Sequence, residues 1–306
     1  MTDHSKDWII KKALELIIND DKIKKYYFIP WLFSIIFLTI LLVYQSIYTY
    51  VELFWNKDKA LQVILKFFHS QYAFEIIIWA IIFILLYIVV IPLFEWWLIK
   101  YIDKKESWNK CDCSENLSHW LMRFLPLFQY NNMFSEFKFM AVVNGYLFML
   151  RFLWLEYIWA LNYVFFILLI FSSIINILFA YSKYFIVIEN KHMFEAISAS
   201  SKLAIYNLWT TIKLYLFMFV LNIRIIINFL VFLLFPVWII SLISIITWKI
   251  FIAITIWALS LIFIWFILFL WYLNSVLEVF KISIWYYWYK SAKERIEALN
   301  EELNNN

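Results

Sequence analysis

Arg224 is the residue whose type and position could do chemistry in this chain. It lies in the apolar stretch 221–228, where a charge within hydrocarbon costs about 2.5–3.5 kcal/mol on insertion scales and should be paired or hydrated. Asn228 lies one helical turn away, and Glu156 or Glu189 could supply the opposite charge. Arg224, Asn228 and Glu156 therefore form a candidate intramembrane polar site. It could contact a small solute or a lipid headgroup, or act as a gating pair.

A packing role for the same residues is the interpretation we favour. Arg224 could lie near the outer interface or bind neighbouring helices through hydrogen bonds, because polar residues of membrane helices often serve packing alone. The available amide partners are Asn144, Asn162 and Asn176.

The sequence offers few residues that could bind a metal or a cofactor. Cys111, Cys113 and His119 offer sulfur and nitrogen ligands within nine residues, but a structural zinc site needs a second pair of ligands. We therefore expect two reduced cytoplasmic thiols and no bound metal or cofactor.

Catalytic signatures are missing as well. The single glycine, Gly145, excludes a phosphate-binding loop, a glycine-flanked nucleophile and a dinucleotide fingerprint. A membrane-embedded enzyme would need several groups gathered in one cavity, drawn from Glu95, Asp103, Glu156 and His119. The sequence predicts that the protein is not an enzyme.

The composition predicts the elements that hold these residues. The 306 residues are 65% hydrophobic and 16% charged, with a mean hydropathy of +0.79, against roughly 45–50% and 25% in soluble domains. So much apolar surface needs lipid around it. At about 20 residues per crossing, we expect an all-α polytopic membrane helix bundle without a sizeable soluble domain.

Apolar runs predict about six transmembrane helices in one domain, residues 30–289. The expected spans are 30–51, 72–94, 137–155, 158–181, 210–235 and 250–275. Residues 236–249 fit either a longer, kinked span or a re-entrant turn. Residues 1–29 read as an amphipathic interfacial segment, and 290–306 as an exposed, polar, helical tail.

Three amphipathic surface helices are expected on one side, near residues 8–18, 118–128 and 191–208. In the first, the shared apolar face consists of Ile9, Ile10, Ala13, Leu14 and Ile17. In the third, Phe194 and Ile205 share a face.

Charge sets the orientation. Nineteen of the 26 Lys and Arg residues fall on the side that holds both chain ends, which by the positive-inside rule is the cytoplasm. We therefore expect a multi-pass protein of the inner (plasma) membrane with both termini cytoplasmic. The net charge is +4. We attribute it to attraction between the basic face and anionic membrane lipids, which we expect as partners, and not to nucleic-acid binding.

The balance of 18 Trp against one Gly is unusual, since average usage would give about 21 glycines. One hypothesis is that many of these positions are glycine in the natural protein, through UGA codons. Trp55, Trp96, Trp97 and Trp108 stand where glycine is common. The alternative is an aromatic belt at the membrane interfaces.

Mass spectrometry of the native protein separates these two hypotheses. Glycine at a Trp position lowers the mass of its peptide by the fixed difference between the two residues. We expect that lower mass in peptides that cover Trp96, Trp97 and Trp108. Intact tryptophan in all three would end the hypothesis.

A short motif on the third surface helix consists of Glu195, Ala196, Ser200 and Leu203. It resembles bacterial six-helix membrane proteins, including the membrane domain associated with glycerophosphoryl diester phosphodiesterases and related inner-membrane families. The resemblance implies fold and location and no activity, because in those relatives the chemistry resides in a separate soluble domain. Physically, small Ala196, Ala199 and Ser200 let the helix pack closely on its neighbours, and Glu195 favours the helix amino end.

The leading functional hypothesis is a non-enzymatic integral membrane protein that acts as a scaffold or binds a partner, with membrane lipids and a membrane protein as its partners. The alternative is a transporter of small solutes or lipids with Arg224 in its pathway.

Overall fold

The computed structural model describes residues 3–20, 23, 28–30, 32–33, 36, 69, 71–107, 116–134, 137–152, 157–221, 223 and 249–305. This part of the chain is almost entirely helical. Its main helices are α1 (Asp3–Asn19), α4 (Ala73–Glu106), α5 (Asn116–Phe134), α6 (Phe139–Phe152), α7 (Ile158–Leu178), α8 (Ser182–Ile188), α9 (Met193–Tyr206) and α11 (Lys249–Asn305). A further helix runs from Leu208 to Leu221. The all-α prediction is therefore confirmed for the described residues.

Two of the described helical segments are long and apolar enough to cross a membrane, Ala73–Glu106 and Ile158–Ile188. The pair Met193–Tyr206 and Leu208–Leu221, bent by 101°, adds a third candidate as a broken span or a re-entrant loop. Most of the predicted span 30–51, half of 210–235 and all but the last residue of the ambiguous stretch 236–249 fall outside the described residues. The described residues thus contain two to three of the helices that a membrane protein needs, and the predicted six are not all seen there.

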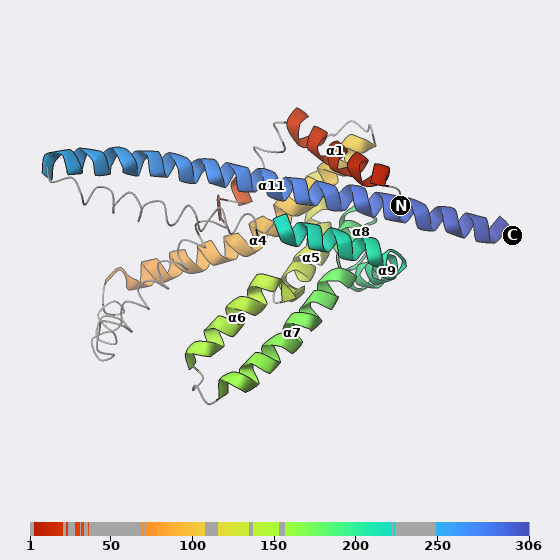
Figure 1. Cartoon of the computed structure of the whole chain (residues 1–306), viewed down its shortest axis with the longest axis horizontal. Coiled ribbons are helices and arrows are strands. Elements are labelled where there is room, and N and C mark those ends of the chain that lie inside the picture. The colour runs from red at the N-terminus through yellow and green to blue at the C-terminus, as the bar shows by residue number, and fades with distance from the viewer. Residues whose placement is uncertain are drawn as a thin grey trace.

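The helices spread from a common centre (Figure 1). α6 and α7 form a hairpin that points away from it, and α4 leaves in a similar direction beside α11. α1, α8 and α9 lie beside the middle of α11, and the end of α11 projects past them. The apolar halves of α4 and α7 are largely exposed, as a lipid-facing surface requires.

α11 is one continuous helix of 57 residues, about 85 Å long at 1.5 Å per residue. The helix passes without a break from the last predicted span into the predicted tail 290–306. Within that tail Ala292 is only 2% exposed, whereas Lys290 is exposed. The helical character expected for this segment is confirmed.

The hydrophobic core lies where α1, α4, α8 and α11 meet. Ile9, Ala13 and Ile17 of the predicted apolar face of α1 are buried, whereas Leu14 of the same face is 43% exposed. α1 packs on α11. It meets buried residues such as Ile99 of α4 and Ile284 of α11 in the same cluster. The amphipathic face of α1 therefore has a protein partner within its own chain.

α9 folds back on α7 and α8 through the motif residues. Ala196, Ser200 and Leu203 are buried, as close packing of small residues requires. The Ser200 hydroxyl donates to the Leu178 carbonyl (2.8 Å) and accepts from the Tyr181 N–H (3.1 Å). Both backbone groups lie at the junction where α7 ends and α8 begins, where backbone groups lack hydrogen-bond partners within a helix. The Ser200 hydroxyl supplies these partners. The packing role expected for Ala196 and Ser200 is confirmed.

Candidate functional site

The candidate site predicted from the sequence lies outside the described residues. This holds for Arg224, Asn228 and Glu156, and also for Cys111 and Cys113. The structure therefore places none of them together, and a transport pathway through Arg224 stays a prediction. His119 lies in α5, but its side chain is not among those described.

The structure instead engages four acidic residues in contacts between helices, and we call these four residues together the carboxylate cluster: Glu95, Asp103, Glu106 and Glu189. The first three follow one another along α4 at intervals of eight and three residues. Such intervals keep side chains on a similar side of a helix. Glu189 joins them from the end of α8.

Glu95 is the buried member of the carboxylate cluster, with 8% of the residue exposed. Lys183 of α8 donates to one of its oxygens, and the amide of Asn131 of α5 donates to the other at 3.1 Å. A buried charge requires such pairing, since an unpaired carboxylate would lose its hydration without compensation. Glu95 therefore ties α4, α5 and α8 together.

Asp103 and Glu106 receive hydroxyl groups from α11. Tyr286 donates to Asp103 at 3.1 Å, and Tyr287 donates to Glu106 at 2.8 Å. Lys12 of α1 also binds Glu106 at 2.5 Å, and its ammonium lies 4.9 Å from the centre of the Tyr287 ring. This part of the carboxylate cluster joins α1 and α11 to the end of α4.

Glu189 is the most heavily bound member of the carboxylate cluster. Tyr289 donates to it at 2.7 Å, and Lys293 and Lys191 approach it at 2.8 Å and 2.7 Å. Burial by itself raises the pKa of Glu189, but the hydrogen bonds from Lys191, Lys293 and Tyr289 outweigh it and bring the pKa to about 2. The folded state therefore favours the ionised carboxylate.

The depressed pKa of Glu189 predicts acid sensitivity. Because it lies below the ordinary value of 4.5, the stability from this group is fully present above about pH 4.5 and is lost as the pH falls toward 2. We expect the melting temperature of the detergent-solubilised wild type to exceed that of Glu189→Gln at pH 7, with the gap shrinking below pH 4.5. Thermal unfolding from pH 7 to pH 3 measures this gap. A gap that is constant across this range would contradict the assignment.

The carboxylate cluster joins helices to one another. Each of its four members accepts hydrogen bonds from residues on other helices or turns. Among the described residues there is no group of three or more His, Cys, Asp or Glu that could hold a metal ion. Glu95 and Asp103, which an embedded enzyme was expected to need, are here engaged with Lys183 and Tyr286.

The functional residues that sequence reasoning missed are the three tyrosines of α11 and Lys183. The run 285–289 consists entirely of Trp and Tyr. Three tyrosines this close together could have indicated a set of internal contacts, because buried tyrosines need hydrogen-bond partners. Comparisons with protein-family models, curated proteins and solved structures found no match. The resemblance to the bacterial six-helix proteins accordingly stays a prediction.

Proposed function

We propose that the protein is a non-enzymatic integral membrane scaffold that binds a membrane-protein partner at its cytoplasmic end. In this proposal about six spans anchor it in the inner membrane, with both termini in the cytoplasm. The observation that carries the proposal is the construction of α11. The helix is about 85 Å long, whereas about 20 residues suffice to cross a bilayer, so much of it extends beyond the lipid.

The extended part of α11 is held firmly where it leaves the core. Tyr286, Tyr287 and Tyr289 bind the carboxylate cluster, and α1 packs alongside. Past this point the end of α11 projects beyond the other helices (Figure 1). A rigid helix held at its base and free along its tip is suited to docking, because little ordering entropy is lost on binding.

The projecting tip, residues 294–302 of α11, carries the side chains that would meet the partner. Glu297 and Glu301 are exposed and lie one turn apart, on one face of the helix. A partner with a basic surface would suit this acidic face, because complementary charge speeds and selects association.

The test is affinity purification of the full chain from native membranes, with stoichiometry measured by quantitative mass spectrometry. We expect a membrane protein at a fixed ratio with wild type, and loss of that protein with the double variant Glu297→Lys, Glu301→Lys. The matched control, Glu297→Asp with Glu301→Asp, keeps the charge and should retain it. Recovery of the chain alone, or equal recovery by all three proteins, would refute the proposal.

A further inference from the structure

The exposed surface of α9 has two flanks of different character. At about 100° per residue, Phe194 and Ile205 fall on one side of the exposed arc, and both are well exposed, at 70% and 61%. Lys202 and Glu195 fall on the other side and are also exposed. With its third face packed into the protein, α9 therefore presents an apolar flank and a polar flank side by side, which is the pattern of a helix lying in a membrane interface.

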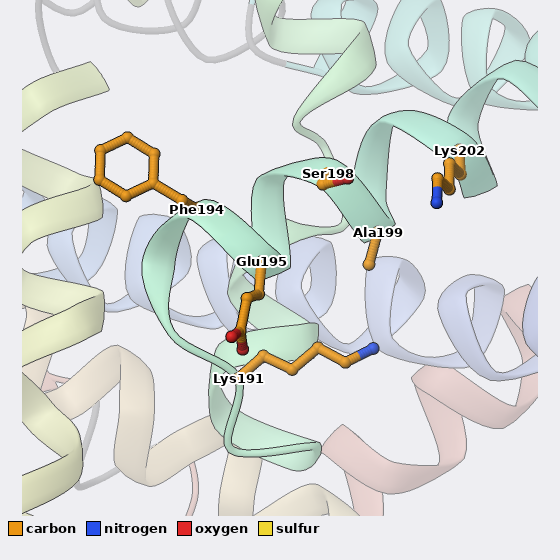
Figure 2. A pocket seen from close by; sticks show the side chains of 6 residues that line it. All are labelled: Lys191, Phe194, Glu195, Ser198, Ala199 and Lys202. Atoms are coloured by element: carbon orange, nitrogen blue, oxygen red, sulfur yellow. The ribbon is translucent and has the colours of Figure 1, made fainter.

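The polar flank borders a shallow pocket of about 630 Å³. Figure 2 shows its lining side chains, with Lys191 extending below α9 and Lys202 on the next turns of the helix beyond Ala199. Phe194 points away from both lysines, at the far end of the same pocket. Basic groups and an apolar edge thus share one concave surface.

The charges around this pocket leave it basic. Within the part of the chain that the structure describes, no contact is seen for the ammonium of exposed Lys202 or for the hydroxyl of Ser198. The Glu195 carboxylate accepts from the backbone N–H of His192 at 3.4 Å. Lys191 contacts Glu189 but remains about one-third exposed. Two lysines and one hydroxyl therefore face a space that holds one carboxylate.

The bend after α9 is compatible with a pocket that lies at the membrane surface. α9 and the helix Leu208–Leu221 meet at 101°, so one can lie along the membrane surface while the other enters it. Exposed Tyr206 and Leu208 stand at the corner. A tyrosine at such a position is typical of the headgroup region, where its ring and hydroxyl meet different environments.

We infer that the polar flank of α9 binds the phosphate of an anionic phospholipid. Lys191, Ser198 and Lys202 contact the headgroup, and the acyl chains lie along the flank of Phe194 and Ile205. This lipid site stands beside the proposed scaffold function and is independent of the tip of α11.

Native mass spectrometry of the full chain in a neutral detergent tests the inference, with phosphatidylglycerol and phosphatidylcholine as probes. We expect tighter binding of phosphatidylglycerol by wild type. Lys202→Gln should weaken it roughly fivefold, since a lysine near an anionic surface contributes about that factor. Adding Lys191→Gln should weaken it further by a similar factor. Because Lys202 makes no contact in the described structure, the single variant should keep the wild-type melting temperature.

The matched control is Lys11→Gln with Lys290→Gln, which removes two exposed lysines elsewhere and should change affinity less than twofold. Inorganic phosphate at millimolar concentration should not displace the lipid. Equal affinity for the two lipids, unchanged affinity in Lys202→Gln, or displacement by inorganic phosphate would overturn the inference. These outcomes do not depend on whether a protein partner is recovered.

Discussion

Replacing Lys183 by Met should lower the free energy of unfolding by about 3–5 kcal/mol, the usual loss when one member of a buried ion pair is removed. The substitution keeps most of the side-chain volume but leaves Glu95 buried with only the Asn131 amide as a direct partner among the described residues. Equilibrium unfolding of the detergent-solubilised protein measures this loss. It is the largest single-residue effect that we expect.

A double variant separates charge from packing. Glu95→Leu combined with Lys183→Met removes both charges, and replacement of a whole buried pair by apolar residues is often neutral or stabilising. We therefore expect the double variant to recover most of the stability lost in Lys183→Met. If the double variant is less stable than the single one, the pair contributes through something other than mutual neutralisation.

Replacing Ser200 by Val should produce the second-largest loss. The hydroxyl satisfies the Leu178 carbonyl and the Tyr181 N–H at the junction of α7 and α8, and each buried group left unsatisfied costs about 1–3 kcal/mol. Val is also bulkier in a position with no exposed surface. Thermal unfolding in detergent should show a clearly lower melting temperature.

Ser198 supplies the matched control on the same helix, because it is exposed. Ser198→Val should change the free energy of unfolding by no more than about 0.5 kcal/mol, as for most surface substitutions. Equal losses in the two variants would show that valine disturbs α9 itself, and that the hydrogen bonds of Ser200 carry little weight.

The helices were predictable because hydropathy and amphipathic period act locally. The expected span 158–181 corresponds to α7 (Ile158–Leu178), and the surface helix near 191–208 corresponds to α9. The apolar face of α1 could be derived from Ile9 and Ala13, since one period fixes which residues share a side. Each of these predictions needs only neighbours within a few turns.

The carboxylate cluster was beyond that reach because its contacts are distant in sequence. Asp103 and Tyr286 are separated by 183 positions, and nothing local to either indicates the other. The polarity of α11 near 290 suggested an exposed helical tail, whereas Ala292 is buried in the core to which α1 also contributes. Which polar residues form contacts inside the protein therefore depends on tertiary packing and not on the local sequence.

The unbroken course of α11 makes it a lever. A bilayer that thins or thickens changes the tilt of the helices within it. The end of α11 lies about 25 Å beyond the three tyrosines, so a rotation of about 5° about them displaces that end by about 2 Å. The three tyrosines that hold α11 partway along would act as the pivot, so a change in lipid thickness would move the tip of the helix.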